Sequence, residues 1–112
     1  MKKYSLGLYE KAMPGTLNWK EKLETAKEAG YDFVEISIDA TEEKIARLDM
    51  TKEERFEIIK AMYEVGIPIR TMCVSALTKY SLGNNKEEYC KRGMEILEKS
   101  LQLADDLGIR VV

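Results

Sequence analysis

One pattern, which occurs three times, constrains the fold more than any other feature of the chain. An amphipathic stretch typical of a helix ends in glycine, and a short apolar, β-branched run follows. These junctions lie at Gly30 before 31–38, at Gly66 before 69–74 and at Gly108 before 109–112. Because glycine adopts the left-handed conformation that ends many helices, the pattern predicts helices that lead directly into strands.

The predicted helix starts agree with this order of helices and strands. Asn18 with Glu21, and Thr51 with Glu54, have the spacing of a capping box. Apolar residues then recur at steps of three and four, and we interpret each stripe as a core-facing side of a helix. The three stripes are Trp19, Leu23 and Ala26; Phe56, Ile59 and Tyr63; and Cys90, Met94, Leu97, Leu101 and Ala104.

Side chains in the predicted strands alternate between an apolar and a polar set. In the run 31–39, Val34, Ile36 and Ile38 are apolar, whereas the alternate positions become polar toward Asp39. Helices that connect parallel strands would cover the apolar set. Central strands of an open doubly wound sheet are hydrophobic on both faces, so the alternation favours a closed barrel. The sequence also contains no G-x-G-x-x-G after the first strand, which disfavours a dinucleotide-binding fold.

The predicted fold class is therefore α/β, a parallel (β/α)8 TIM barrel. Such a barrel has eight strand–helix units and about 250 residues, whereas this chain of 112 residues contains about three and a half units. We expect residues 1–112 to be a single incomplete domain, the N-terminal portion of a TIM barrel.

The composition excludes several kinds of catalytic chemistry and several classes of partner. The chain has no histidine, which excludes Ser-His and Cys-His nucleophile pairs and imidazole metal ligands from these residues. With 18 Lys and Arg against 20 Asp and Glu, nucleic acid is not an expected partner. No apolar run is long enough for a membrane span or a signal peptide, and two cysteines fit no disulfide framework. A cytoplasmic location with reduced thiols is expected.

Four segments resemble the sugar-phosphate isomerases and epimerases of the xylose-isomerase-like TIM-barrel superfamily. The resemblance is greatest to the L-ribulose-5-phosphate (L-xylulose-5-phosphate) 3-epimerase family, often named hexulose-6-phosphate isomerase. The segments are Leu-Gly-Leu-Tyr-Glu-Lys-Ala-Met-Pro at 6–14, Tyr-Asp-Phe-Val-Glu-Ile-Ser-Ile-Asp at 31–39 with Arg-Leu-Asp at 47–49, Met-Cys-Val-Ser-Ala at 72–76, and Leu-Gly-Ile-Arg-Val at 107–111. They follow one another at the family's spacing across nearly the whole chain.

The resemblance implies inversion at carbon 3 of a phosphorylated ketose, in carbohydrate metabolism. In this family two glutamates exchange the proton and a divalent cation stabilises the enediolate. Those residues belong to later strands, so no catalytic residue and no metal ligand is expected within residues 1–112. The third matched segment departs from the family, because Leu77, Thr78 and Lys79 stand where His-Arg-Arg is usual. On this resemblance, the change is expected to affect substrate preference and activity.

Four residues are candidates for substrate binding. Tyr9, Glu10 and Lys11 follow the first strand, where barrel enzymes place loops that face the substrate. Ser75 ends the third strand, where it would contact substrate or cap the loop. For Glu10 and Lys11 the alternative is a solvated loop pair.

Other polar residues have structural explanations. Glu35 faces inward, and a buried ion pair with Lys or Arg of another strand is expected rather than catalysis. Cys73 and Cys90 are expected to be packed thiols rather than nucleophiles.

A hypothesis of another class is that the chain is a catalytically inactive half-barrel. It would act by self-association or as a binding module, because an incomplete parallel sheet exposes a strand edge and an apolar face. A homo-oligomer is expected on either hypothesis.

Overall fold

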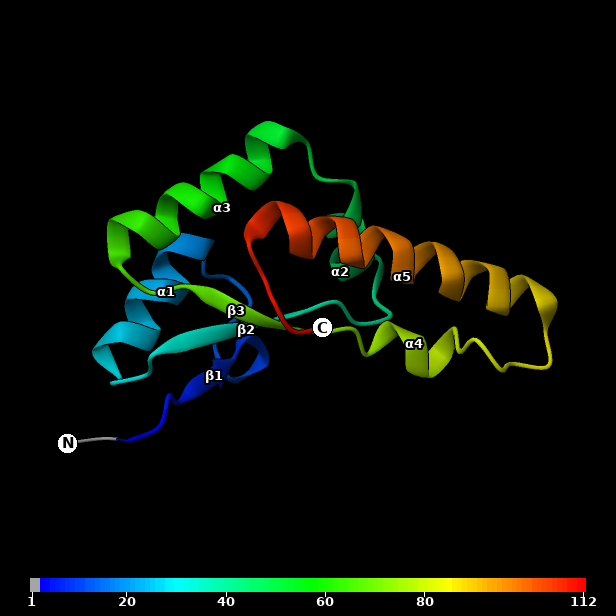
Figure 1. Ribbon diagram of the computed structural model, residues 1–112, viewed down its shortest axis with the longest axis horizontal. Coiled ribbons are helices and arrows are strands. Elements are labelled where there is room, and N and C mark those ends of the chain that lie inside the picture. Colours follow the sequence, from blue (N-terminus) through cyan, green and yellow to red (C-terminus); the bar gives the residue numbers. More distant parts are fainter. Residues whose placement is uncertain (1–2) are drawn as a thin grey trace.

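Three short parallel strands form the centre of the protein (Figure 1). The computed structural model describes residues 3–112. The strands are β1 (Gly7–Tyr9), β2 (Phe33–Ser37) and β3 (Ile69–Cys73), and they lie in the order β1-β2-β3. Val111 forms an isolated parallel bridge with Thr71, so a fourth extended segment lies beside β3. This is the α/β arrangement of parallel strands joined by helices that the sequence predicts.

Three long helices connect the strands and pack along one face of the sheet (Figure 1). They are α1 (Trp19–Glu28), α3 (Lys52–Val65) and α5 (Glu87–Leu107). Shorter turns occur where the chain leaves each strand: η1 (Glu10–Ala12), α2 (Glu42–Ile45), η2 (Ala46–Asp49) and α4 (Ala76–Lys79). The molecule measures 48 × 32 × 25 Å, and α4 with the first half of α5 extends beyond the carboxyl ends of the strands.

The predicted helix ends are confirmed. Both capping boxes form, with the side chains of Asn18 and Thr51 accepting from the backbone N–H groups of Glu21 and Glu54. Gly30, Gly66 and Gly108 all have positive φ. These local signals therefore define where each strand–helix unit begins and ends.

The apolar set of β2 faces the helices. Val34, Ile36 and Ile38 are each 0% exposed, in the same core as Leu23 and Ala26 of α1. Their burial under the helix layer confirms the predicted division of the strand into an apolar and a polar set.

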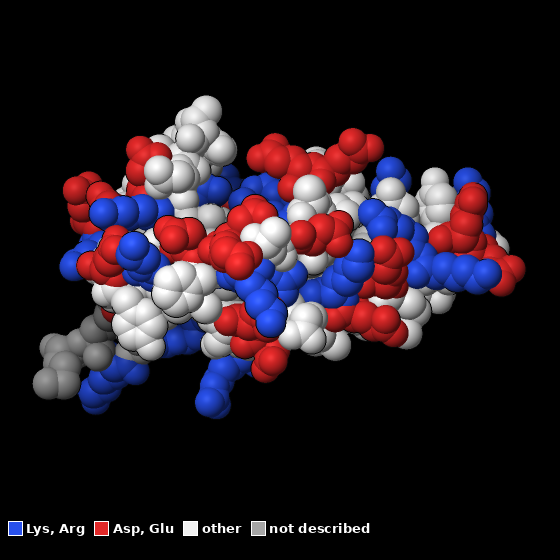
Figure 2. Space-filling model, turned by 90° about the horizontal axis from the view of Figure 1, so that it is seen from above, with Lys and Arg blue, Asp and Glu red and all other residues white. Residues whose placement is uncertain are grey.

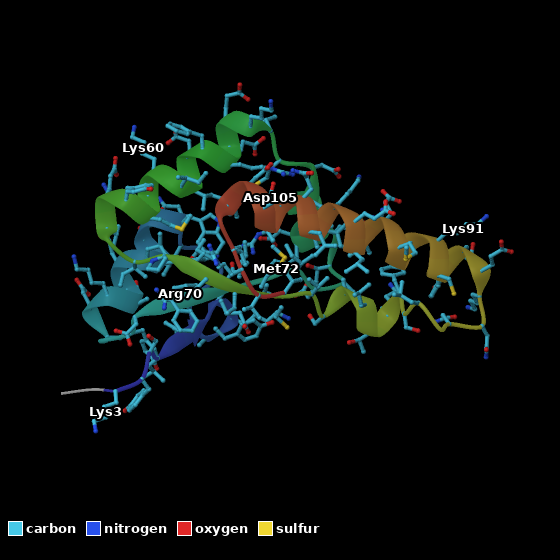
Figure 3. The ribbon with its side chains drawn as sticks, viewed as in Figure 1. Lys3, Lys60, Arg70, Met72, Lys91 and Asp105 are labelled. Carbon is cyan, nitrogen blue, oxygen red and sulfur yellow. The ribbon has the colours of Figure 1, made fainter. Side chains whose placement is uncertain are left out.

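An irregularity in β3 changes which of its residues share a face. The pairing shifts between Val34–Ile69 and Glu35–Thr71, so β3 contains one extra residue there. As a result, Ile69 and Met72 are both buried under the helices, whereas the guanidinium of Arg70 lies over the ring of Phe33 on the other face (Figure 3).

The predicted stripe of α3 is displaced from the buried side of the helix, although its middle residue, Ile59, is partly buried against the core. The buried residues are Arg55, Ile58, Ala61 and Val65, while Phe56 and Tyr63 are 60% and 85% exposed. The apolar residues of this helix fit two adjacent stripes, and the structure buries the one that includes an arginine. Arg55 tolerates burial because it donates to Asp106 of α5 and to the backbone carbonyl groups of Leu48 and Met50.

The prediction for α5 is only partly correct, because Ala104 of the predicted stripe is buried but two of its larger residues are not. Met94 and Leu101 are about half exposed, whereas the buried side is formed by Gly93, Ile96, Ser100, Leu103, Ala104 and Leu107. Gly93 belongs to this side because the helix approaches α4 closely there: a Cβ at position 93 would lie 2.1 Å from the carbonyl oxygen of Tyr80.

The outer face of the helices carries charges of both signs. In the view of Figure 2, Lys and Arg are interspersed with Asp and Glu, and no extended positive area of the kind that binds nucleic acid is present on this face. Among residues 3–112, no helix is both long enough and apolar enough to span a membrane.

Candidate functional site at the carboxyl ends of the strands

Polar side chains gather where the three parallel strands end. Tyr9 ends β1, Ser37 ends β2 and Cys73 ends β3, and Asp39 and Ser75 follow two residues after the latter two strands. Carboxyl ends of parallel strands meet at one edge, which is where α/β barrels place their active sites. This edge is therefore the candidate site.

Lys11 and Asp39 form an ion pair at this edge. The distance from Lys11 Nζ to Asp39 Oδ2 is 2.8 Å, and the Lys11 side chain is 45% exposed. Thr41 donates to the other oxygen, Oδ1, through its backbone N–H and its hydroxyl. Burial alone would raise the pKa of Asp39, but the hydrogen bonds from Lys11 and Thr41 lower it to about 2. The result is a fixed carboxylate beside an accessible cation, a combination suited to hydroxyl or anionic groups of a ligand.

Tyr9 lies on the inner face of the sheet beside this pair. Its hydroxyl donates to Ser37 Oγ at 3.1 Å, and Ser37 is completely buried. Burial raises the pKa of Tyr9, and its hydrogen bond with Cys73 raises it further, although the contact with Ser37 opposes this. The phenol therefore stays neutral at physiological pH, and because its hydrogen is donated to Ser37, it provides a ligand with an acceptor.

Glu10 is the centre of a buried ion cluster. Its side chain is 1% exposed and accepts from Arg47 Nη1 at 2.6 Å, from Lys22 Nζ at 2.5 Å and from Lys44 Nζ at 3.1 Å. The backbone N–H of Ser37 donates to Glu10 Oε1 at 2.9 Å. Each carboxylate oxygen is therefore already occupied by protein donors.

The cluster keeps Glu10 ionised. Burial by itself would raise the pKa of Glu10, but hydrogen bonds from Arg47, Lys22 and the Ser37 backbone hold it far below its usual range. The ring of Trp19 packs over two of the cations, with its centroid 4.8 Å from Lys22 Nζ and 5.2 Å from Arg47 Cζ. One carboxylate thus joins η1 to α1, α2, η2 and the end of β2.

The structure brings three of the four predicted site residues to this edge as accessible or partly accessible groups. Tyr9 and Ser75 are half-buried, and Lys11 is exposed. Substrate contact by Tyr9, Lys11 and Ser75 stays a prediction. For Glu10 the structure shows a buried carboxylate bound to protein groups instead of one open to a ligand.

The buried ion pair expected at Glu35 is found at Glu10. Among the described residues Glu35 forms no ion pair, and its Oε2 accepts from Thr71 Oγ1 at 2.7 Å. Lys79, in the segment that departs from the family pattern, is exposed on α4 with its Nζ 5.2 Å from the ring centroid of Tyr80. Cys73 and Cys90 are both free thiols.

The part of the chain that the structure describes does not provide a metal site. No three of its Asp, Glu and Cys side chains lie close enough together to hold a metal ion. Asp39 and Glu10, the carboxylates nearest the strand ends, are each bound to cationic side chains. Both carboxylates are therefore already neutralised by protein cations.

Sequence reasoning missed Asp39 as a site residue and missed the partners of Glu10. Asp39 was detectable, because it is the last member of the polar set of its strand. The partners were not, since Lys22, Lys44 and Arg47 lie 12, 34 and 37 residues from Glu10 in otherwise ordinary amphipathic segments.

Comparison with known proteins agrees with the fold. The family model described as xylose isomerase-like TIM barrel matches residues 23–112. The chain is 42% identical over 111 residues to an L-ribulose-5-phosphate 3-epimerase, UlaE, of Escherichia coli O139:H28, and equally identical to the protein of the same name from Salmonella heidelberg. The matches cover 99% of this chain but 39% of each relative.

A solved structure shows the same arrangement of elements. The apo form of the 3-keto-D-glucoside 4-epimerase YcjR from E. coli superimposes with a TM-score of 0.72 and 26% identity. The superposition covers 97% of this chain and 36% of that chain. The chain therefore spans well under half the length of the proteins that it resembles.

Proposed function

This chain belongs to the xylose isomerase-like TIM barrel family, and from that membership we propose that the whole protein is an isomerase that inverts carbon 3 of a ketose phosphate. The observation that carries the proposal is the 42% identity, along 99% of the chain, to proteins named L-ribulose-5-phosphate 3-epimerase. A pentulose or hexulose 5- or 6-phosphate is the proposed substrate class.

The reaction needs groups that this chain does not supply. Epimerisation beside a carbonyl removes a proton from one face of the carbon and returns one to the other, which requires two acid/base groups and a means of stabilising the enediolate. We propose that both glutamates and the divalent cation's ligands lie outside residues 1–112.

The proposed role of this chain is to hold the sugar. Tyr9 and Ser75 provide hydroxyl groups, and Lys11 provides a cation whose orientation is fixed by Asp39. Hydroxyl and ammonium groups suit a ligand with several hydroxyls and a carbonyl, because each hydroxyl can both donate and accept. The free thiols of Cys73 and Cys90 support a reducing, cytoplasmic location.

Activity of a protein that contains this chain and completes the barrel tests the proposal. We expect conversion of L-ribulose 5-phosphate to L-xylulose 5-phosphate in the presence of a divalent cation. Lys11→Met should lower kcat/KM by about 10- to 100-fold, the effect of losing one charged hydrogen bond. Lys91→Met is the control, since Lys91 is exposed on the distant half of α5 (Figure 3).

Two results would contradict the proposal. Equal activity of the Lys11→Met and Lys91→Met variants would show that Lys11 does not contact the substrate. No turnover of any ketose phosphate, together with oligomers in sedimentation velocity, would favour the self-associating module, for which the exposed Leu6 and Val111 at the two edges of the sheet are the supporting observation.

A further inference from the structure

We propose that Glu10 and Arg47 are positioning residues that orient the Lys11–Asp39 pair by fixing the peptide of Ser37 at the end of β2. The inference rests on the proposed function, in which Lys11 contacts the substrate. Neither Glu10 nor Arg47 is proposed to touch the substrate.

The backbone of Ser37 is hydrogen-bonded to both Glu10 and Arg47. Its N–H donates to Glu10 Oε1 at 2.9 Å, and its carbonyl accepts from Arg47 Nη1 at 2.9 Å. The same guanidinium also donates to both oxygens of Glu10. The N–H and the carbonyl of the final residue of β2 are therefore both bound by one bidentate ion pair. Bidentate pairing restricts the orientation of the two side chains as well as the distance between them.

The hydrogen-bonded unit of Glu10, Arg47 and Ser37 is connected through the backbone to the Lys11–Asp39 ion pair. Asp39 lies two residues beyond Ser37, and Lys11 is the neighbour of Glu10 in η1. The two ends of the Lys11–Asp39 contact are thus each attached to a member of the Glu10–Arg47–Ser37 unit. A shift of either backbone segment would change the 2.8 Å separation between Lys11 Nζ and Asp39 Oδ2.

The position of Glu10 is itself fixed by two further cations. Lys22 of α1 and Lys44 of α2 bind the same carboxylate oxygen, Oε2, from separate elements. Because contacts with α1, α2 and η2 all converge on one buried carboxylate, its position is determined from several directions. An ion cluster of this kind is costly to bury and adds little net stability, but it specifies geometry, which is what a ligand-contacting pair requires.

Arg47→Lys tests the inference better than a change at Glu10. A neutral residue at position 10 would leave three cations without a counter-charge, and the variant would unfold. Lysine at 47 keeps the positive charge but cannot bind both oxygens of Glu10 and the Ser37 carbonyl together.

Arg55→Lys is the matched control. Arg55 is similarly buried, donates to one carboxylate and to two backbone carbonyl groups, and lies in the contact between α3 and α5 instead of at the strand ends.

The first measurement is the titration of Asp39 by carboxyl-detected NMR in this chain. In the wild type the Asp39 pKa is about 2. We expect it to rise toward its ordinary value of 3.8 in Arg47→Lys, because Lys11 is no longer held against it, and to stay unchanged in Arg55→Lys. Loss of stability alone would not produce this difference, since both variants lose buried contacts.

The second measurement is steady-state kinetics in the protein with a completed barrel. Arg47→Lys should raise KM for the ketose phosphate about tenfold with kcat changed less than about twofold, as expected for one misoriented charged contact. Arg55→Lys should change neither value.

The outcomes separate the two proposals. If the wild-type protein does not convert a ketose phosphate, the proposed function fails, and the Asp39 titration still decides whether Arg47 orients the pair. If Arg47→Lys and Arg55→Lys give the same Asp39 titration and the same KM, the positioning role is overturned.

Discussion

Two serines show how differently a buried hydroxyl can be placed in this protein. Ser37 and Ser100 are both 0% exposed. The hydroxyl of Ser37 accepts from Tyr9, whereas that of Ser100, on the buried side of α5, has no hydrogen-bond partner among the described residues. A buried polar group without a partner loses its hydration and gains nothing in return, so the two side chains contribute to stability with opposite sign.

Ser100→Ala is therefore expected to stabilise the protein. It removes an unpaired hydroxyl and replaces serine with a better helix former, which together should raise the free energy of unfolding by about 1 kcal/mol. Urea denaturation followed by circular dichroism measures the change. Ser37→Ala is the control and should lower the free energy of unfolding; a lower value for Ser100→Ala would show that its hydroxyl has a partner.

At the scale of single residues, sequence reasoning predicted which side chains lie near the carboxyl ends of the strands but not which of them are exposed to solvent. Glu10 and Lys11 are adjacent and equally plausible as ligand contacts from sequence. Only the folded chain shows that Glu10 is enclosed and Lys11 is exposed. The difference arises from cations 12 to 37 residues away, whose approach depends on packing that no local pattern describes.

At the scale of helices and strands, the ends were predictable and the faces were only partly so. Capping boxes and C-terminal glycines act through their own backbone, so they are visible in a short stretch of sequence. Which side of α3 and α5 is buried depends on contacts between helices. Phe56 and Met94 are exposed although they are more hydrophobic than Arg55 and Gly93, which are buried because of Asp106 and Tyr80.

Gly93→Ala tests the close contact between α4 and α5. Alanine favours a helix over glycine by about 1 kcal/mol, but its Cβ would overlap the Tyr80 carbonyl oxygen, which is backbone and cannot rotate away. We expect a net loss of roughly 1–3 kcal/mol in the free energy of unfolding. Thermal and urea denaturation provide the measurement.

Gly83→Ala is the matched control for this contact. Gly83 lies in the connection between α4 and α5, and its added Cβ would meet no atom within 4 Å. A Gly93→Ala protein as stable as the Gly83→Ala protein would contradict the packing described here.

At the scale of the whole molecule, repetition made the fold predictable. Three helix–glycine–strand junctions indicated parallel strands joined by helices, and alternation within the strands indicated that one face is covered. The short turns α2, η2 and α4 were not predicted, because they are single turns whose positions follow from contacts with η1 and α5 rather than from a repeated pattern.

The ion pairs at the strand ends give the molecule a defined response to acid. The pKa values of Glu10 and Asp39 are both lowered in the folded state, from 4.5 and 3.8 respectively. A lowered carboxyl pKa contributes stability above the unfolded value and loses it as pH falls through the folded value. We expect the free energy of unfolding to decrease as pH falls from about 5 to about 2.

Urea denaturation at several pH values measures this response. Asp39→Asn removes one of the two carboxyl groups and should make the decrease smaller. Glu53→Gln, an exposed residue in the first turn of α3, should leave it unchanged. An Asp39→Asn protein with the same pH dependence as the wild type would show that the contact with Lys11 does not contribute to stability.

The ion cluster around Glu10 also divides the neighbourhood of the site into positions that tolerate substitution and positions that do not. Lys11, Ser75 and the turn 77–79 lie at or near the surface, so substitutions there do not disturb the core. Glu10 and Arg47 lie beneath these surface residues and connect five separate elements. On the proposed function, a combinatorial library that aims to broaden the substrate range should vary the first group and keep the second constant.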